Sequence, residues 1–439
     1  MDACKLGAAE QGRLIAAGQL DPVELTEAYL EAAEAEGARI YARLTPERAR
    51  AEAEAARTRA RQGVRRGPLD GVALSWKDLF DTAGIATESG SRLLEGRVPG
   101  RDAEVLEAAA LAGTICLGKT HMTELAFSGL GVNPSTATPP NAHDPKLAPG
   151  GSSSGAALSV AKGLAAAAIG SDTGGSVRIP SAWNDLVGLK TTHGRLSLRG
   201  VVPLCKRFDT VGPLARNVED CAHLLAAMEG RRAPDLRDAT LAGARLLVLE
   251  GLPFEGARAE PVAGFEAAVK LLEAAGARIE RRALAMVTPA LALSGVLFAP
   301  EAYGLWKDVI EAAPEKMYPL ILERFRGGAQ VLAADYVKAW DDLARYRSAW
   351  LEATAGYDAV LVPTAPILPP DATRLLTDRH YFEAENLLAL RNTRIGNVLG
   401  LCALTLPTGA PMTGISLMAA PMAEDRLLRL GHAAEAALG

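Results

Sequence analysis

Apolar and polar residues alternate along several short segments of the chain in the way that β-strands require. In residues 72–77 (Val-Ala-Leu-Ser-Trp-Lys), the large apolar side chains fall on one face, and Lys77 falls on the other among small residues. A turn at residues 67–71 (Gly-Pro-Leu-Asp-Gly) leads into this strand. Short apolar runs predict further strands at residues 114–117, 246–249, 359–362, 403–406 and 415–418.

Helices are indicated by start signals followed by apolar residues at helical spacing. Asp21 and Pro22 form a capping signature with proline at the first helical position, which predicts a helix to about residue 35. Residues 45–47 (Thr-Pro-Glu) open a second, alanine-rich helix in the same way. Helical patterns also cover residues 102–112, 261–275, 298–355 and 426–438.

This alternation of buried strands with amphipathic helices is typical of the α/β class. The sequence therefore predicts an α/β/α sandwich around a mixed, largely parallel sheet. With 439 residues, of which 49% are apolar and 23% are charged, the chain can bury a large core. No proline- or serine-rich linker, charge block or repeat divides the sequence, so we expect one domain over residues 1–439.

Two clusters of serine and glycine carry the most informative chemistry. Residues 150–155 read Gly-Gly-Ser-Ser-Ser-Gly, and residues 170–176 read Gly-Ser-Asp-Thr-Gly-Gly-Ser. The segment between them, 156–169, is apolar enough to be buried, whereas a flexible Gly/Ser linker would be solvated. Glycine lets backbone N–H groups approach a reacting oxyanion, and serine supplies a nucleophile. We interpret the two clusters as an active site.

These clusters resemble the pattern of the amidase signature family. That pattern runs from a Gly-Gly-Ser-Ser cluster through an alanine-rich segment to Gly-Ser-Asp-Thr-Gly-Gly-Ser, with a catalytic lysine upstream in a Lys-Asp pair. Here the pair is Lys77-Asp78, and Ser152 precedes Ser176 by 24 positions, which is the family spacing. The resemblance implies the amidase signature fold. It extends over nearly the whole chain, because matches also occur at residues 118–124, 188–190, 209–213 and 424–428.

The resemblance implies roles for residues 173–176 of the second cluster. Ser176 would be the nucleophile that attacks the amide carbonyl. The G-x-S-x-G pattern of a nucleophile elbow also fits residues 151–155, with Ser153 as nucleophile, but it follows a loop instead of the strand that such an elbow requires. The oxyanion hole would be formed by the backbone N–H groups of Thr173, Gly174, Gly175 and Ser176.

Lys77 can act as the base only if it is neutral, because an ordinary lysine has a pKa of about 10.4. Burial among small residues would lower this pKa by disfavouring the ammonium form. Ser152 would then relay protons between Ser176 and Lys77, and the resemblance places Ser152 on a cis peptide bond. We expect Ser154 to orient the lysine by a further hydrogen bond. The alternative is that Lys77 is a surface residue, as a lone lysine after a strand usually is.

Two charged residues flank the predicted nucleophile. Asp172 and Arg178 lie four residues before and two residues after Ser176. We expect an ion pair that braces the oxyanion loop, and the competing interpretation is that Arg178 binds a substrate carboxylate. The chain departs from the common family pattern at residues 183–185 (Trp-Asn-Asp) and at Thr191, which bears on the packing beneath this loop.

The motifs divide the single domain into parts. Helices occupy the N-terminal residues 1–62, and the catalytic core with the signature motifs occupies residues 65–225. The helical segment 298–355 either covers the mouth of the site or packs as an ordinary layer. The catalytic lysine and both serines must meet in one core if they act together.

Charge and cysteine content restrict the partners and the location. A net charge of −5 argues against a nucleic-acid surface, and the basic run at residues 61–66 is typical of a solvated helix end. Residues 1–20 lack the apolar stretch of a secretion signal, and no run approaches the roughly 20 apolar residues of a membrane span. Five scattered cysteines indicate reduced thiols. We expect a cytoplasmic protein with no nucleic-acid or membrane partner, acting alone or as a homodimer.

The resemblance implies an amide hydrolase that cleaves a small-molecule carboxamide to a carboxylate and ammonia or an amine. No cofactor or metal is expected, because the six histidines show no metal-ligand spacing and the glycines fit neither a P-loop nor a dinucleotide turn. The alternative is the amidase component of a tRNA-dependent amidotransferase, which releases ammonia from glutamine for a partner. In that component the Lys-Asp pair is commonly followed by asparagine, whereas in this chain Lys77-Asp78 is followed by Leu79. Candidate pocket residues are Phe127, Ser128 and Trp183.

Overall fold

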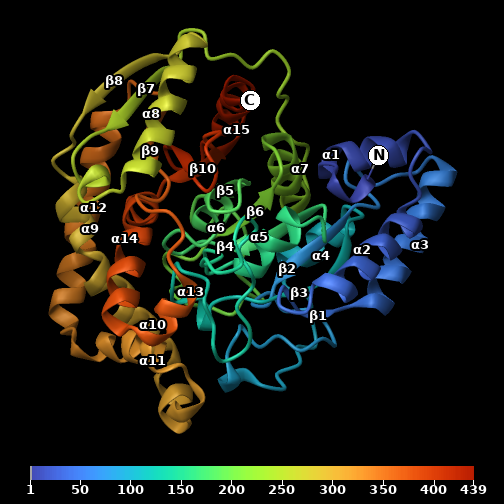
Figure 1. Ribbon diagram of the computed structural model, residues 1–439, viewed down its shortest axis with the longest axis horizontal. Coiled ribbons are helices and arrows are strands. Elements are labelled where there is room, and N and C mark those ends of the chain that lie inside the picture. Colours follow the sequence, from blue (N-terminus) through green and yellow to red (C-terminus); the bar gives the residue numbers. More distant parts are fainter. Residues whose placement is uncertain (1) are drawn as a thin grey trace.

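Within residues 2–439, which the computed structural model describes, eleven strands form one sheet (Figure 1). Met1, the first residue of the expected N-terminal segment, lies outside the described residues. The strand order is β1-β3-β2-β4-β6-β5-β10-β11-β9-β7-β8. The strands are β1 (Tyr41–Leu44), β2 (Ala73–Lys77), β3 (Ile115–Thr120), β4 (Ala167–Ser171), β5 (Val187–Lys190), β6 (Val211–Ala215), β7 (Arg245–Leu249), β8 (Arg278–Arg282), β9 (Ala359–Pro363), β10 (Cys402–Pro407) and β11 (Gly414–Ala419).

Helices surround this sheet. They are α1 (Ala8–Ala16), α2 (Pro22–Glu36), α3 (Pro46–Gln62), α4 (Glu104–Leu111), α5 (Ser154–Ala161), α6 (Arg178–Ala182), α7 (Val218–Glu229), α8 (Ala259–Ala274), α9 (Val287–Ala292), α10 (Ser294–Ala312), α11 (Pro319–Arg326), α12 (Ala333–Thr354), α13 (Ala372–Thr377), α14 (Arg379–Val398) and α15 (Glu424–Leu438). Figure 1 shows α1 to α3 together at one end of the molecule and α9 to α12 at the other.

The predicted α/β class and mixed sheet are confirmed, but the expectation of a largely parallel sheet is wrong. In the described sheet, six of the ten neighbouring strand pairs are antiparallel. Parallel pairs join β3-β2-β4 and β9-β7-β8. Parallel neighbours need a crossover of a dozen or more residues, usually a helix. Only residues 408–413 join β10 to β11, and the described segment between β5 and β6 contains no helix, so both pairs run antiparallel.

Most of the predicted elements are confirmed with small changes at their ends. Asp21 accepts a hydrogen bond from Val23 N and caps α2, as the capping signature predicts. Thr45 precedes α3, but its hydroxyl donates to Cys116 O at 2.9 Å and does not cap the helix. The strands predicted from alternation and from short apolar runs correspond to β2, β3, β7, β9, β10 and β11.

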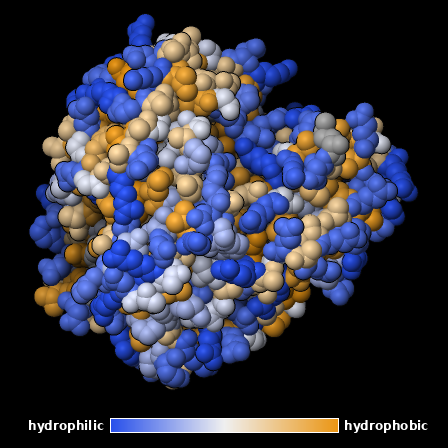
Figure 2. Space-filling view, in the orientation of Figure 1, coloured by the Kyte–Doolittle hydropathy of each residue, from blue (hydrophilic) through white to orange (hydrophobic). Residues whose placement is uncertain are grey.

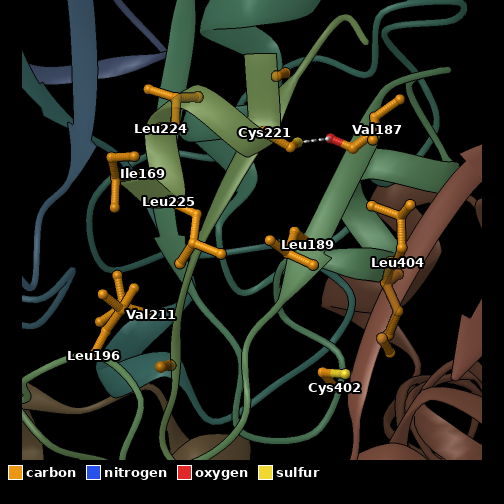
Figure 3. Close-up of a cluster of buried hydrophobic side chains, with 14 of the residues drawn as sticks. Ile169, Val187, Leu189, Leu196, Val211, Cys221, Leu224, Leu225, Cys402 and Leu404 are labelled. Atoms are coloured by element: carbon orange, nitrogen blue, oxygen red, sulfur yellow. Dashed lines mark hydrogen bonds between the residues drawn. The ribbon is translucent and has the colours of Figure 1, made fainter. Parts of the chain in front are cut away.

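A cluster of apolar side chains fixes α7 on the central strands (Figure 3). Leu224 and Leu225 of α7 lie in this cluster and are at most 1% exposed. Ile169 of β4 and Leu189 of β5 lie beside them and are fully buried. Each such side chain contributes about 1.5–3 kcal/mol to folding. The cluster therefore holds β4, which leads into the second Ser/Gly cluster, in a fixed position.

The segment 298–355 forms most of α10 together with α11 and α12. Trp306 and Trp350 are buried in the core. Trp340 stacks on Phe208, with 5.2 Å between the ring centroids. These contacts show a packed helical layer.

On the face shown in Figure 2, hydrophilic residues cover most of the surface, and apolar residues form small scattered groups. Such groups are ordinary for a folded protein, because polar side chains cannot cover a whole surface. Across the described residues, no helix combines the length and the apolar composition that crossing a bilayer requires.

Candidate active site

Lys77 and Ser171 are the last residues of β2 and β4, which are parallel neighbours. Because the carboxyl ends of parallel strands meet at the same edge of a sheet, both side chains come together there. Residues 172–177 follow β4 as a loop that leads into α6, and residues 150–153 lead into α5. The fold therefore brings both Ser/Gly clusters to the end of the strand that carries Lys77.

Lys77 is fully buried, and its amine contacts both clusters. Nζ donates to Ser152 Oγ at 2.7 Å and to Ser171 Oγ at 2.9 Å. Because both partners are neutral hydroxyls, burial lowers the pKa of Lys77 to about 7, against the weaker opposing attraction of Asp172 and Asp209. About half of the lysine is then neutral near pH 7 and able to accept a proton.

The backbone around Ser152 depends on glycine. A cis peptide bond joins Gly151 to Ser152, which is the feature that the family resemblance implies. Gly150 has a φ of +78°, in the left-handed region that glycine adopts without strain. A β-carbon on Gly151 would lie 2.6 Å from Gly131 N, so no larger residue fits there. This close packing sets Ser152 Oγ against the lysine.

The expected hydrogen bond from Ser154 to Lys77 is absent from the described residues, and that expectation is wrong. Ser154 is the first residue of α5, and its hydroxyl donates to His121 O at 3.5 Å. His121 follows β3, so Ser154 faces that loop and not the lysine. Ser171 takes the role that we expected of Ser154.

Ser153 links the two clusters. Its backbone N–H donates to Ser176 O at 3.2 Å, and its hydroxyl donates to Ser171 O at 3.2 Å. The same hydroxyl accepts from Ser171 N at 3.4 Å, and the side chain is fully buried. A hydroxyl used in this way has a structural role, which argues against Ser153 as the nucleophile of an elbow.

The loop 173–176 presents free backbone N–H groups beside a serine. In the described part of the chain, none of these four N–H groups donates a hydrogen bond, and Ser176 keeps 4% of its surface exposed. Gly175 has a φ of +142°, and a β-carbon there would lie 2.2 Å from Thr393 Oγ1. Thr393 Oγ1 donates to Gly174 O at 2.7 Å and fixes the loop from outside. This arrangement is what an oxyanion hole requires.

Asp172 and Arg178 form a fully buried ion pair. Nε and Nη2 of Arg178 donate to the two carboxylate oxygens at 3.0 Å each. The carboxylate also accepts from Val177 N at 3.2 Å, which closes the loop around Ser176. Burial alone would raise the pKa of Asp172, but the Arg178 guanidinium outweighs it and lowers the pKa to about 2. Arg178 has no exposed surface. This geometry fits the expected ion pair that holds the loop around Ser176, and it does not fit the binding of a substrate carboxylate by Arg178.

Four buried residues complete the site although the sequence did not mark them as functional. They are Ser171, Asp209, Thr393 and Asn397. Asp209 accepts from Thr173 Oγ1 at 2.6 Å, and burial raises the pKa of Asp209 to about 6. Ser171 and Asp209 lie inside sequence motifs that match the family. Those motifs could therefore have identified both residues as candidates for the site. Thr393 and Asn397 lie 219 positions beyond their partners, where no local pattern identifies them.

The departures from the family pattern are accommodated by buried hydrogen bonds. Trp183 is fully buried, and its Nε1 donates to Ile367 O at 3.1 Å. Asn184 Nδ2 donates to Pro149 O at 2.8 Å, just before the first cluster. Thr191 Oγ1 donates to a carbonyl of β6 at 2.7 Å. These hydrogen bonds hold the segments that pack next to the two Ser/Gly clusters. Because Trp183 is fully buried, it does not line a substrate pocket.

Comparison with known proteins defines the class to which this site belongs. The family model described as Amidase matches residues 24–428. The chain belongs to this amidase family, and it is an enzyme of the class that hydrolyses carbon–nitrogen amide bonds.

Several individual proteins resemble the chain over most of its length. It is 36% identical to the 2-amino-5-chloromuconic acid deaminase of Comamonas testosteroni, with 89% of this chain and 87% of that protein covered. It is 34% identical to a glutamyl-tRNA(Gln) amidotransferase subunit of Anaeromyxobacter dehalogenans, with 99% and 97% covered. The solved structure of an amidase matches with a TM-score of 0.87 at 31% identity, covering 99% and 100%. The peptide amidase of Stenotrophomonas maltophilia matches with a TM-score of 0.81 at 27% identity, covering 98% and 96%.

Proposed function

We propose that the protein hydrolyses a small-molecule carboxamide through an acyl-Ser176 intermediate. The observation that carries this proposal is the 2.7 Å hydrogen bond between Lys77 Nζ and Ser152 Oγ, made by a lysine whose pKa burial lowers to about 7. A buried amine between two neutral hydroxyls neutralises no acidic group by direct contact. It is placed to accept a proton at neutral pH.

In the proposed reaction, Ser176 Oγ attacks the carbonyl carbon and passes its proton to Ser152, which gives its own proton to neutral Lys77. The N–H groups of residues 173–176 stabilise the oxyanion. When the tetrahedral intermediate collapses, the carbon–nitrogen bond breaks, and the proton returns through Ser152 to the leaving nitrogen. Water then attacks the acyl group through the same relay, and the carboxylate leaves Ser176.

The relatives support the reaction class. One relative is a deaminase of 2-amino-5-chloromuconic acid, and one structural neighbour is a peptide amidase. Their names describe chemistry at carbon–nitrogen bonds in two different molecules. We extend that shared chemistry to this chain.

A second candidate function is that of the amidase component of a tRNA-dependent amidotransferase. The 34% identity to such a component over 99% of this chain favours it. The same catalytic residues would then release ammonia from glutamine for a partner. Leu79, which is buried in the core, stands where that component commonly carries asparagine. The free-standing hydrolase therefore stays our first proposal.

We further propose that the protein works in the cytoplasm, alone or as a homodimer, without a nucleic-acid or membrane partner. In the described residues all five cysteines are free, and four of them are buried. Unpaired cysteines fit a reducing compartment.

The test of the proposed function is an activity screen. Purified protein is incubated with aliphatic, aryl and dicarboxylic amides and with glutamine, and released ammonia or amine is measured. We expect turnover of at least one small carboxamide, and its loss in Ser176→Ala with an unchanged melting temperature. Ser348→Ala, an exposed serine on α12, is the control. Turnover of glutamine alone, dependent on a partner protein, would favour the second candidate, and no turnover of any amide would refute the first.

A further inference from the structure

A buried carboxylate outside both Ser/Gly clusters contacts the start of the oxyanion loop. It belongs to Asp209, which lies two residues before β6 and is 5% exposed. Its Oδ1 accepts from Thr173 Oγ1 at 2.6 Å. Thr173 is the first residue of the loop 173–176, whose backbone N–H groups are free. This contact therefore joins the segment before β6 to the oxyanion loop.

Backbone groups of a tight turn hold the Asp209 carboxylate in one orientation. Oδ2 accepts from Leu204 N at 3.0 Å, and both oxygens accept from Cys205 N at 3.1 Å. Asp209 N in turn donates to Cys205 O at 2.8 Å. Because these groups are part of the backbone, the carboxylate cannot follow Thr173 if the loop moves. Asp209 is therefore a fixed acceptor for the Thr173 hydroxyl.

The turn that carries Asp209 is itself anchored on two sides. Asp172 N donates to Thr210 O at 2.8 Å, and Thr210 N donates to Asp172 O at 3.2 Å, so the residues next to Thr173 and Asp209 pair as strands do. On the other side, Nε1 of Trp306 in α10 donates to Pro203 O at 2.8 Å. The oxyanion loop thus begins at a rigid point.

The charge of Asp209 also acts on the catalytic lysine. Among the described residues the hydrogen-bond partners of Asp209 are all neutral. Burial, with a smaller contribution from the charge of Glu301 in α10, raises the pKa of Asp209 to about 6, so the carboxylate is mostly ionised at pH 7. Its charge raises the pKa of Lys77, against the larger opposite effect of burial. Asp172 acts on Lys77 in the same direction, but Asp172 is paired with Arg178.

We propose that Asp209 is a positioning residue of the reaction. Its carboxylate holds Thr173 so that the Thr173 N–H group faces the oxyanion, and its charge favours the protonated form of Lys77 that each proton transfer creates. An oxyanion donor is effective when it is held in place before the reaction begins. Asp209 acts through Thr173 and Lys77 and does not itself contact the reacting atoms. This proposal rests on the proposed amide hydrolysis and adds a residue from outside the two clusters.

The first test removes the hydrogen bond from the side of the oxyanion loop. Valine has the shape of threonine but cannot donate, so Thr173→Val should lower kcat roughly 10- to 100-fold and change KM less than about threefold. Thr173→Ser, which restores the hydroxyl, should recover most of this loss. Asp308→Asn, an exposed aspartate of α10, is the control. Wild-type kcat in Thr173→Val would overturn the proposal.

A double-mutant cycle tests whether the two residues act through one hydrogen bond. Asp209→Asn should also lower kcat roughly 10- to 100-fold. The combined variant, Thr173→Val with Asp209→Asn, should lose about as much as the more damaging single variant. Losses that multiply would show that Asp209 and Thr173 act independently, and this result would overturn the proposal.

The pH profile distinguishes this role from a structural one. Asp209→Asn removes a charge that favours protonated Lys77, so the pH at which kcat/KM reaches half of its plateau should fall by roughly 0.5–1 unit. Damage to the fold would lower the rate without moving this pH. The variant should melt within about 5 °C of wild type at pH 7, because it loses hydrogen bonds but also a carboxylate whose ionisation burial disfavours. An unchanged half-plateau pH would overturn the proposal, and so would a decrease in melting temperature above about 15 °C.

Covalent labelling separates this proposal from the proposed function. The phosphonyl oxygen of a fluorophosphonate occupies the oxyanion hole whatever the natural substrate is. We expect the adduct on Ser176 to form roughly 10- to 100-fold more slowly in Thr173→Val and Asp209→Asn than in wild type and Asp308→Asn. This result in a protein that hydrolyses no amide would refute the proposed function alone. Amide hydrolysis by wild type, with equal labelling rates in all four proteins, would refute the present proposal alone.

Discussion

Replacing Lys77 with methionine or arginine separates a proton acceptor from a structural charge. Methionine has a similar length but cannot accept the proton, and the arginine guanidinium stays protonated. We expect both variants to lose at least roughly 10²- to 10⁴-fold in kcat/KM, the range that general base catalysis supplies. Ammonia release from the best wild-type substrate measures the loss, and Lys162→Met, an exposed lysine, is the control.

The pH dependence follows from the lowered pKa of Lys77. Because this pKa is about 7, wild-type kcat/KM should rise about tenfold per pH unit below pH 7 and level off above it. An ordinary lysine, with a pKa of about 10.4, would keep the rate rising to about pH 10. Burial thus increases the neutral fraction at pH 7 by roughly 10³-fold.

The same pKa change lowers the stability of the wild type at neutral pH. The unfolded chain holds the proton up to a pKa of about 10.5 and the folded site only up to about 7, so the free energy of unfolding rises with pH between these values. The difference corresponds to about 5 kcal/mol at pH 7 and below. Lost hydrogen bonds to Ser152 and Ser171 would cost Lys77→Met about 1–2 kcal/mol each. The variant should therefore be roughly 1–3 kcal/mol more stable than wild type at pH 7, and this advantage should disappear by about pH 10.

Denaturant unfolding of wild type and Lys77→Met at pH 7 and pH 10 measures this difference. An arginine variant with near-native activity would refute the reasoning. So would a rate that is constant between about pH 5 and 7, where the neutral fraction should change about 50-fold. A methionine variant less stable than wild type at pH 7 would show that Lys77 is a structural charge.

Three further predictions concern the residues around the lysine. Ser171→Ala should lower kcat/KM about tenfold because Ser171 holds the amine, whereas Ser154→Ala should change it less than about threefold; equal losses in steady-state assays would contradict this difference. Gly175→Ala should lower kcat by roughly 10²- to 10³-fold, since its β-carbon would meet Thr393 Oγ1 at 2.2 Å, and near-native kcat would show that the loop N–H groups are not used. Asp172→Asn should lower the free energy of unfolding by about 3–5 kcal/mol at pH 7, measured in denaturant, and an unchanged value would contradict it. In wild type this contribution is complete above the ordinary aspartate pKa of about 3.9 and is lost as pH falls through about 2.

Local signals explain which parts of the fold could be predicted. The alternation in residues 72–77 placed Lys77 at the end of a strand, and the glycine and serine content marked both loops. The strands β5 and β6 were not predicted, because glycine or proline interrupts the apolar pattern of each. The strand β8 reads Arg-Ile-Glu-Arg-Arg, the composition of a solvated edge, and pairs only with β7. Its strand conformation depends on that pairing and not on its own pattern.

Tertiary contacts explain what the sequence could not supply at the site. The choice between Ser154 and Ser171 as the partner of Lys77 depends on the pairing of β2 with β4, in which Trp76 lies opposite Ile169. That register brings Ser171 to the lysine, and no local pattern in either strand reveals that the two strands are neighbours.

Covalent labelling tests the identity of the nucleophile most directly. The protein is incubated with a fluorophosphonate, digested and analysed by mass spectrometry of the modified peptide. We expect an adduct on Ser176 that is absent in Ser176→Ala and forms at least roughly 10²-fold more slowly in Lys77→Met, because the serine then lacks its base. An adduct on Ser153, or labelling of Ser176 at the wild-type rate in Lys77→Met, would contradict the proposed mechanism.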